Sequence, residues 1–586
     1  MVTSGLIDAL SRAGAHRGDP VALVVKPGSG IGLAVNGQAW AVGGSEMAPT
    51  VSPLSDVAAI EAALRPRWVL WSAATASALV RVGLHISTAW DLTAVHALLH
   101  GGWRVDVGRV WAAAHDLPLD GVPTVAPDDL FSALHDVAGD PEDPVQPDGH
   151  LRAVWADGGW GDRPERLRRW ASLALDVADR QLAQLTAVAD AYGPRAVVTA
   201  RSESGAELLC AEMTVGGLPM DRATAESIIA GFVGPRPRND AEAVELRLGR
   251  DAEVLRHVPA GVEVDLRSNA QIKVLLSRLG IEVADTRAWR LREVQGRHPV
   301  VGALLAWRKA ERMGTTYGYR WLDEHLGPDG RLRGEWSGSD GAAGRMTASA
   351  GLHSMPADLR AAVVAESGMV FVRADLGQIE PRVLAVVSAD RALAAAAGED
   401  DMYAPVAAQL DVDRATAKTA VLGAMYGATT GHGAQALRRL DASYPVAMAY
   451  LAGAARQAEA GRDLRTYGGR LIRMGPAGAG GSSTEASGAV AARGRYGRNA
   501  VIQGAAAELF KMWAVTVRAR IAGLGAHIIL CLHDELLVHA LRSQATALAE
   551  VVSQALEESV RRWAPGTSVR FPADIAVITR WSEAKG

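Results

Sequence analysis

Alternating apolar residues mark the first segment of the chain as one that contains β-strands. Two such runs flank a Pro/Gly turn in VALVVKPGSGIGLAVNGQAWAV, residues 21–42, which predicts a β-hairpin, and RWVLWSA, residues 67–73, adds a short strand. Residues 163–193 instead place apolar side chains every three or four positions among mixed charges, which predicts one long helix ending at Gly193. We therefore expect an α/β domain over residues 1–195.

The rest of the chain is predicted to start with helices and then to alternate strands with helices. Residues 205–330 have a helical period with little β signal. The clearest later strands are MVFVRADL (369–376) and AHIILCLHDELLVHAL (526–541), and the clearest helices are DRATAKTAVLGAMYG (413–427) and GRNAVIQGAAAELFKMWAVTVRARI (497–521). The Gly- and Ser-rich residues 475–494 are expected to form a loop. This order predicts an α/β multidomain protein.

Length and composition favour a globular protein of several structural units. A chain of 586 residues is too long for one hydrophobic core. Mean hydropathy is +0.06, and no uninterrupted apolar run is long enough to span a bilayer. The first residues lack the basic head and apolar stretch of a signal peptide, and two cysteines, Cys210 and Cys531, are too few for a disulfide framework. We expect a cytoplasmic protein with no membrane partner.

The charge is distributed unevenly along the chain. A formal net charge of −4 by itself argues against binding to nucleic acid. However, residues 1–195 contain 15 basic and 22 acidic residues, whereas the remainder contains 46 basic and 43 acidic residues. The later part is therefore the better candidate for binding a polyanion.

Two acidic sites in the later part have the character of metal ligands. Asp375 comes at the end of the strand 369–376, and His533, Asp534 and Glu535 stand together inside an apolar run. A bare carboxylate in apolar surroundings is costly unless it is paired or holds a metal. Asp375 and Asp534 could together hold two Mg²⁺ ions, the usual arrangement for displacement at phosphorus. Taken alone, either aspartate could equally be a helix N-cap or a turn residue.

The predicted helix 413–427 carries a stripe of side chains that changes from basic to apolar and aromatic along the helix. Arg414, Lys418, Leu422 and Tyr426 recur every four residues, so they form one line roughly 18 Å long on a helix. Two cations followed by an apolar and an aromatic residue suit a nucleoside triphosphate, with the cations on the phosphates. An ordinary amphipathic helix with a solvated basic end would give the same spacing.

Six segments together resemble the family A DNA polymerases. DLGQIEPR (375–382) resembles motif A, RATAKTAVLGAMYG (414–427) resembles motif B, and HDE (533–535) resembles motif C, in the family's order. Three further segments resemble family elements around these motifs: GRMTASAGLHSMP (344–356), RYGRNAVIQGAAAELFK (495–511) and FPADIAVITRWSEA (571–584). The resemblance covers about residues 205–586, and the chain is similar to proteins of the kind named bifunctional 3′–5′ exonuclease/DNA polymerase.

The resemblance implies a two-metal nucleotidyltransferase site. Asp375 and Asp534 would ligate two Mg²⁺ ions, for which Mn²⁺ can substitute, and the Leu376 carbonyl would be a further ligand. One ion would lower the pKa of the primer 3′-hydroxyl and the other would stabilise the leaving pyrophosphate. Glu535 would support the metals, and His533 would hold the primer terminus.

The resemblance also implies where substrates bind. The dNTP site would comprise the motif A and motif B residues Gln378, Glu380, Arg414, Lys418, Leu422 and Tyr426, with Glu380 as the gate against a ribose 2′-hydroxyl. Lys418 is the residue best placed to protonate pyrophosphate. Minor-groove acceptors of primer–template DNA would be read by Arg345, Arg495, Asn499 and Gln503, together with contacts from His533.

Several positions depart from the family's pattern. Leu376 and Gly377 replace a tyrosine and a serine of motif A, Leu422 replaces an aromatic residue of motif B, and Ala343 replaces a threonine. We expect altered packing around the sugar and lower affinity or fidelity toward dNTPs.

The N-terminal segment departs more strongly from the family than the polymerase motifs do. Val24 and Lys26 stand where the family's RNase H-like 3′–5′ exonuclease carries an Asp-x-Glu metal pair. Asp91 and Asp176 remain as single acidic candidates, which we interpret as helix-surface residues. Without paired carboxylates there is no two-metal exonuclease site.

The function predicted from the sequence is template-directed DNA synthesis without proofreading, in replication or repair. By resemblance we expect a degenerate RNase H-like domain at 1–195 and a right-hand polymerase at 196–586, with a helical thumb at 240–330, helical fingers at 395–500 and an antiparallel palm sheet. The protein is expected to act as a monomer. There are two alternatives: a polymerase that retains exonuclease activity and a catalytically idle DNA-binding scaffold. An RNA polymerase is disfavoured because Glu380 would oppose the 2′-hydroxyl of its substrates.

Overall fold

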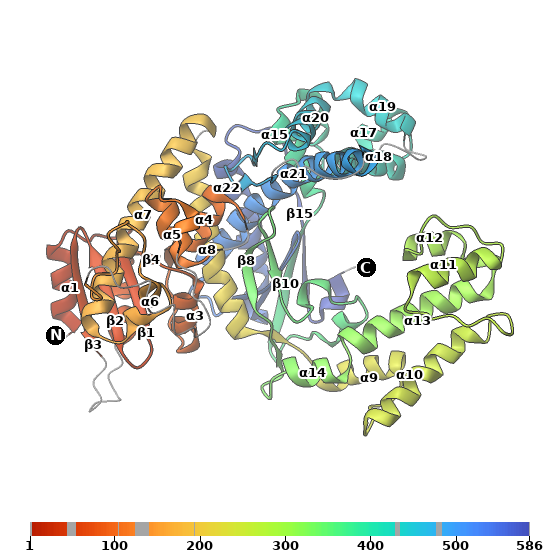
Figure 1. Cartoon of the computed structure of the whole chain (residues 1–586), viewed down its shortest axis with the longest axis horizontal. Helices are drawn as coiled ribbons and strands as arrows, with labels where there is room; N and C mark the ends of the chain where they lie inside the picture. The colour runs from red at the N-terminus through yellow and green to blue at the C-terminus, as the bar shows by residue number, and fades with distance from the viewer. Residues whose placement is uncertain are drawn as a thin grey trace. The chain divides into compact units, whose positions relative to one another are not determined.

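The computed structural model shows a helix-rich α/β chain (Figure 1) and describes residues 3–43, 54–102, 105–122, 140–192, 194–427, 434–475 and 483–584. Its residues group into two units. The first comprises residues 1–216, 335–347 and 370–577, and the second comprises residues 217–334, 348–369 and 578–586. The predicted α/β class is therefore confirmed, while the expected domain boundary near residue 195 stays a prediction.

The N-terminal part of the first unit is built on a five-stranded sheet. Its strands, in the order β3-β2-β1-β4-β5, are β3 (Gln38–Gly43), β2 (Gly30–Val35), β1 (Pro20–Lys26), β4 (Arg67–Leu70) and β5 (Thr88–Asp91). β1 pairs antiparallel with β2, and β2 with β3, whereas β4 is parallel to both β1 and β5. The predicted hairpin and the short strand after it are both confirmed.

Helices cover this sheet on its two faces. They are α1 (Thr3–Arg12), α2 (Leu54–Leu64), α3 (Ala73–Arg81), α4 (Leu92–His100), α5 (Val107–Ala114), α6 (Ala153–Ala156), α7 (Pro164–Tyr192) and α8 (Arg195–Gly216). The long helix predicted for residues 163–193 is confirmed as α7, which packs on β1, β2 and β3 (Figure 1) and stacks Trp170 on Trp71. The opposite face packs α1, α2 and α3 over Leu23, Leu33 and Trp68. Alternate residues of each strand therefore enter separate cores.

A four-stranded sheet forms the centre of the rest of the first unit. Its strands, in the order β13-β14-β10-β15, are β13 (His527–Leu532), β14 (Glu535–Leu541), β10 (Met369–Leu376) and β15 (Ala573–Ile578). β10 matches its prediction. The run 526–541, expected as one strand, is instead an antiparallel hairpin in which Leu532 pairs with Glu535. His533 and Asp534 form its two-residue turn, because His533 adopts a left-handed φ of 55° that no continuous strand allows.

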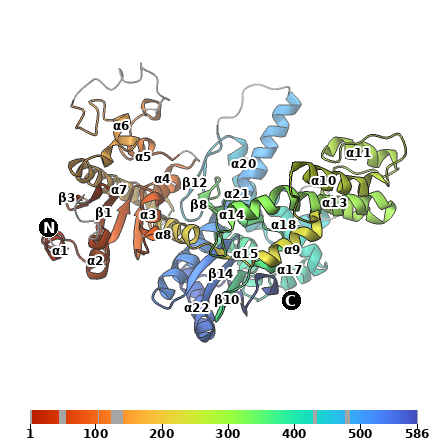
Figure 2. The ribbon, with the colours of Figure 1, turned by 90° about the horizontal axis from the view of Figure 1, so that it is seen from below.

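Helices and short hairpins surround this sheet. The helices are α15 (Ile379–Ser388), α16 (Arg391–Ala396), α17 (Tyr403–Leu410), α18 (Arg414–Tyr426), α19 (Ala434–Ser443), α20 (Pro445–Glu459), α21 (Ser483–Ile521) and α22 (Ala545–Trp563). The hairpins are β8 (Trp336–Asp340) with β9 (Arg345–Ala348) and β11 (Leu464–Arg465) with β12 (Leu471–Ile472). α21 lies beside α20 in Figures 1 and 2.

The start of α21 corrects the loop predicted for residues 475–494. The helix begins at Ser483, and residues 476–482 lie outside the described residues. Within the helical part, Gly494 and Gly497 approach Glu459 and Ala458 of α20 so closely that a Cβ at either position would overlap them. Small residues here therefore allow helix contact, which overrides the weak helix propensity that suggested a loop.

A buried ionic network joins α8 to α21. Glu203 on α8 and Lys511 on α21 are both inaccessible to solvent, and the Lys511 ammonium lies 2.5 Å from the Glu203 carboxylate. Arg470, after β11, also pairs with Glu203. The Lys511 Nζ donates to the Gly344 carbonyl at 2.7 Å, next to Arg345. The network thus anchors the start of β9.

The second unit is mostly helical, as predicted for residues 205–330. It contains α9 (Arg222–Val233), α10 (Asp240–Leu255), α11 (Asn269–Arg278), α12 (Ala288–Glu293), α13 (Pro299–Thr316), α14 (Tyr319–His325) and the short strands β6 (Leu218–Pro219) and β7 (Arg331–Leu332). Asp221 caps α9 by accepting a hydrogen bond from the Thr224 amide, as expected. Leu276, Leu291 and Leu304 are buried together in its core.

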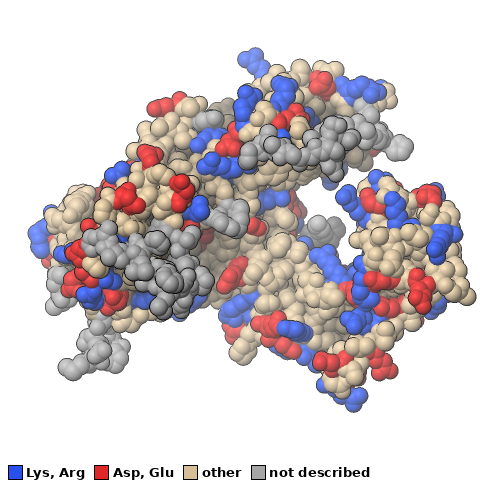
Figure 3. Space-filling model, viewed as in Figure 1, with Lys and Arg blue, Asp and Glu red and all other residues tan. Residues whose placement is uncertain are grey.

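Charges of both signs are mixed on the surface, and one long helix in the core is mostly apolar. Figure 3 shows Lys and Arg side chains interspersed with Asp and Glu on the visible face of each unit. Among the described residues one helical stretch, Gly488–Ile521 within α21, is long and apolar enough to cross a membrane, which the sequence had not suggested. Its apolar window is 89% buried, as in the core helix of a folded domain, so this is weak evidence for a membrane segment.

Candidate active site

Two strand ends bring Asp375 and Asp534 together. Asp375 is the penultimate residue of β10. Asp534 lies in the turn between β13 and β14, and β14 is the strand that pairs with β10. The backbone N–H of Leu376 donates to the backbone carbonyl of Asp534 at 2.9 Å, which fixes the two segments side by side. Burial, reinforced by the nearby Asp375 carboxylate, raises the pKa of Asp534 to about 6. Such mutual repulsion is what a bound cation would relieve.

The donor set at this edge fits a hard divalent cation. Among the described residues no group of three or more His, Cys, Asp or Glu side chains has metal-binding geometry. Mg²⁺, however, is usually held by one or two carboxylates together with water and substrate phosphates. Asp375 and Asp534 supply two carboxylates, and the Leu376 carbonyl belongs to the same strand end. The residues present therefore fit the predicted cation.

A buried arginine that the sequence analysis did not single out contacts this carboxylate cluster. Arg373 on β10 is only 3% exposed, and its three guanidinium nitrogens contact three different carboxylates. The distances are 2.5 Å to Asp375, 3.0 Å to Glu535 and 3.1 Å to Asp574. Alternation along β10 could have indicated the first contact, because residues two apart share one face of a strand. Glu535 is thus buried against Arg373.

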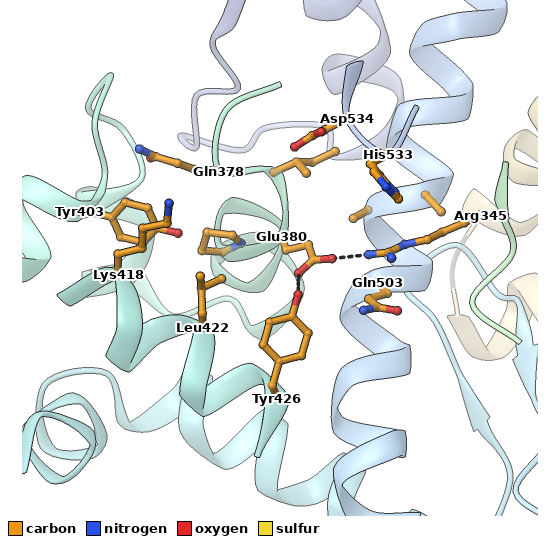
Figure 4. Close-up of a pocket in the computed structure, with 14 residues that line it drawn as sticks. Arg345, Gln378, Glu380, Tyr403, Lys418, Leu422, Tyr426, Gln503, His533 and Asp534 are labelled. Carbon is orange, nitrogen blue, oxygen red and sulfur yellow. Dashed lines mark hydrogen bonds and ion pairs between the residues drawn. The ribbon is translucent and has the colours of Figure 1, made fainter. Parts of the chain in front are cut away.

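The first turn of α15 presents Glu380 between two partners. The Arg345 guanidinium lies 2.6 Å from one Glu380 oxygen, and the Tyr426 hydroxyl donates to the other at 2.8 Å (Figure 4). Burial and the neighbouring Glu380 raise the pKa of Tyr426 to about 12, so the phenol stays a hydrogen-bond donor at neutral pH. Gln378 precedes the helix with a left-handed φ of 63° and donates to Asp401 at 2.7 Å.

Helix α18 carries the predicted stripe. Asp413 caps the helix by accepting a hydrogen bond from the Thr416 amide. Lys418, Leu422 and Tyr426 line an open cavity of about 280 Å³ (Figure 4). The remaining lining residues come from β9, α15, α17, α21 and the β13–β14 turn: Arg345, Gln378, Ile379, Glu380, Pro381, Tyr403, Gln503, Ala506, Ala507, His533 and Asp534.

Arg414, at the first turn of α18, is not among the residues that line the cavity. Its guanidinium pairs with Asp401, with Nε 2.6 Å from one carboxylate oxygen and a second nitrogen 3.1 Å from the other. Asp401 also accepts from Gln378 and from the Tyr403 amide. Asp401 and Tyr403, a lining residue, were both missed from the sequence, because neither stands in a recognisable pattern.

Three of the four residues predicted to read the minor groove share one face of α21. Arg495, Asn499 and Gln503 are spaced by four residues, and Gln503 lines the cavity. Arg495 lies against Gly427, where an added Cβ would come within 2.7 Å of the arginine side chain. Arg345, the fourth, contacts Glu380. His533 lines the cavity from its left-handed position in the turn.

The N-terminal acidic candidates lie in different surroundings. Asp91 is 1% exposed and caps α4 through hydrogen bonds from Thr93 and Ala94, so its interpretation as a helix-surface residue was wrong. Its pKa rises to about 6, mainly because it is buried. Asp176 is half-exposed on α7 and lies 2.8 Å from His115. The sequence could not show that β5 ends inside the core.

Comparisons with known proteins identify the family of the chain. The family model for DNA polymerase family A matches residues 242–583, which is more than half of the chain. The chain is 30% identical over 372 residues to DNA polymerase I of Chloroflexus aurantiacus, covering 55% of this chain and 38% of the relative. It is 28% identical over 389 residues to the thermostable DNA polymerase I of Thermus filiformis, covering 59% and 45%. The chain thus spans less than half the length of these relatives.

A solved structure extends the likeness to nearly the whole fold. The POL domain of Pol1 from M. smegmatis, in complex with DNA primer-template and dNTP, superposes with a TM-score of 0.69 over 99% of this chain and 98% of that one. The identity is 22%, so this comparison speaks for the fold. Fold, cavity residues and family match together define the class: the chain belongs to DNA polymerase family A.

Proposed function

We propose that the chain is a template-directed DNA polymerase that adds dNTPs to a primer 3′-hydroxyl. One observation carries the proposal: residues from six separate segments converge on one cavity, which is lined by two carboxylates, a lysine and two tyrosines. The solved relative with the same fold contains primer–template DNA and dNTP. A catalytically idle scaffold would have no need of Asp534, Lys418 and Glu380 in one place.

Different residues of the cavity would bind different parts of the dNTP. Lys418 is exposed and lines the cavity, so its charge would neutralise the triphosphate. Arg414 would join it after leaving Asp401. Leu422 and Tyr426 would contact sugar and base, and Glu380 would oppose a 2′-hydroxyl. Because Leu422 is aliphatic, its contact lacks the stacking of an aromatic side chain.

Asp375 and Asp534 would hold Mg²⁺ at the strand ends. When bound, the metal supplies activation of the 3′-hydroxyl and charge neutralisation at the triphosphate. The protein residues orient the reactants: His533 would bind the primer terminus, and Arg345, Asn499 and Gln503 would contact the minor groove. Lys418 would give a proton to pyrophosphate.

The architecture supports assignment of polymerase subdomains. We assign the four-stranded sheet as the palm, helices α17 to α20 with the start of α21 as the fingers, and the helices of the second unit as the thumb. The β3-β2-β1-β4-β5 order, with β1 at its centre, supports an RNase H-like N-terminal domain. Replication or repair in the cytoplasm, as a monomer, is the role we infer.

We propose further that this N-terminal domain does not proofread. Val24 is buried in the core, and the Lys26 side chain lies against Gly161 with its ammonium 6.0 Å from the Trp160 ring centre. No carboxylate therefore occupies either position of the expected pair on β1. Asp91 is used as a helix cap, and Asp176 is paired with His115 and Arg180.

Primer extension tests both proposals. The purified chain with Mg²⁺ and a 5′-labelled primer on a longer template should extend the primer when dNTPs are present, and Asp534→Asn should abolish extension. Without dNTPs the primer should keep its length. Shortening that persists in Asp534→Asn would contradict the absence of proofreading, and failure of the wild type to extend would refute the polymerase.

A further inference from the structure

Arg373 places a permanent positive charge inside the predicted metal site. Its side chain is 3% exposed, and Glu535, at 8% exposure, is its most buried partner. Arginine stays protonated at all physiological pH values, and its planar fork can engage several carboxylates at once. The site therefore contains three carboxylates, Asp375, Asp534 and Glu535, already partly neutralised by one fixed cation.

We propose that Arg373 acts as a resident counter-ion that weakens divalent-metal binding to the DNA-free protein, so that metal is acquired together with the triphosphate. The proposal rests on the polymerase function proposed above. Asp375 has one oxygen engaged 2.5 Å from Arg373, so an incoming cation meets a carboxylate that is already paired. A triphosphate brings the negative charge that makes a further cation favourable.

Arg373 is on this view a positioning residue. It holds Glu535 from β14 and Asp375 from β10 in one arrangement, since both carboxylates contact the same guanidinium group. Asp574 on β15 is the third partner, but it is 77% exposed, so solvent screens its contribution. The buried charge of Arg373 should therefore affect metal binding more than the exposed charge of Asp574 does.

Mn²⁺ binding to the protein without DNA or dNTP, followed by the electron paramagnetic resonance signal of free Mn²⁺, tests the proposal. Arg373→Gln keeps hydrogen-bond donors but removes the charge. A unit charge about 6 Å from a divalent ion changes affinity by about tenfold even with water-like screening, so this variant should bind Mn²⁺ at least about tenfold more tightly. Asp534→Asn measures binding away from the site.

Two controls separate charge from shape. Arg373→Lys retains the charge and should bind Mn²⁺ as the wild type does. The double variant Arg373→Met/Glu535→Gln removes one charge of each sign and no longer buries an unpaired carboxylate, so it should fold even where Arg373→Gln does not. Its Mn²⁺ affinity should exceed that of the single variant Glu535→Gln by about tenfold, since these two proteins differ only at position 373.

The outcomes distinguish this inference from the proposed function. Equal or weaker Mn²⁺ binding by Arg373→Gln, with primer extension by the wild type, would refute the role of Arg373 and leave the polymerase standing. Tighter binding by Arg373→Gln with no extension by the wild type would support the counter-ion and refute the polymerase. A double variant that folds but binds Mn²⁺ no more tightly than Glu535→Gln would also contradict the charge argument.

Discussion

The proposed role of Glu380 in the selection of dNTPs over rNTPs can be tested directly. Its carboxylate is held by Arg345 at 2.6 Å and Tyr426 at 2.8 Å, and its side chain is 14% exposed. A 2′-hydroxyl entering beside it would require the carboxylate to move. Movement in either direction breaks at least one of these two hydrogen bonds.

The size of the effect follows from those bonds. A hydrogen bond to a charged group contributes about 1.5–3 kcal/mol. If entry of a ribonucleotide breaks one of these hydrogen bonds at a cost of about 2 kcal/mol, the protein selects against ribonucleotides by about 30-fold. Glu380→Ala should therefore lower the dNTP-to-rNTP selectivity by at least about 30-fold, because the side chain that must move is gone. Tyr426→Phe leaves the Arg345 contact and should lower it less.

Single-turnover incorporation of dCTP and CTP opposite the same template base measures the ratio of kcat/KM values directly. Incorporation of dCTP by each variant serves as the control for intact chemistry. An unchanged dNTP-to-rNTP ratio in Glu380→Ala, with dCTP incorporation retained, would refute the assignment of Glu380 as the gate. A larger loss in Tyr426→Phe than in Glu380→Ala would show that the phenol, and not the carboxylate, opposes the 2′-hydroxyl.

Three further predictions concern stability and nucleotide affinity. The pKa of Asp534 is raised to about 6 in the folded state, so its ionisation destabilises the metal-free protein as pH rises from about 4 to 6. Asp534→Asn should therefore be more stable than the wild type by up to about 3 kcal/mol at pH 7.5 and by almost nothing at pH 3.5. Urea unfolding in the presence of EDTA measures both differences. Lys511→Met should lose about 3–5 kcal/mol of unfolding free energy in the same assay because it leaves Glu203 buried with one partner fewer, whereas Lys309→Met at an exposed ion pair should lose less than about 1 kcal/mol. Asp401→Asn should bind dNTP more tightly in equilibrium titrations, since Arg414 no longer has to leave a carboxylate; weaker binding would contradict this.

Local patterns predicted the elements that carry the site. Strand β10 and helix α18 follow from period-two and period-3.6 repeats within single segments, so Asp375 and the stripe from Lys418 to Tyr426 could be placed from sequence. The resemblance supplied Glu380, whose two partners are the structural finding. The β13–β14 turn was missed because an apolar run interrupted by polar residues is compatible with one strand or with two.

Long-range contacts could not be predicted in the same way. Arg373 meets Asp574 across 201 positions of sequence, and Lys511 meets Glu203 across 308. No periodicity within a segment reports such pairs. Asp91 was misjudged for a related reason: its burial depends on α8, whose Ser204 hydroxyl accepts a hydrogen bond from the Asp91 amide. Burial of a strand end is decided by what packs on it later.

The two-residue turn between β13 and β14 limits which changes of chain length the protein can tolerate. Side chains alternate between the faces of a sheet, and all residues of β14 except the last are buried, so a single inserted or deleted residue would move each side chain beyond it into the core on the wrong face. Upstream, an irregularity in the pairing between Ile528 and Leu530 already absorbs one change of register. Evolution of this hairpin should therefore proceed by substitution, with length variation confined to the β13 side and absent between His533 and the end of β14.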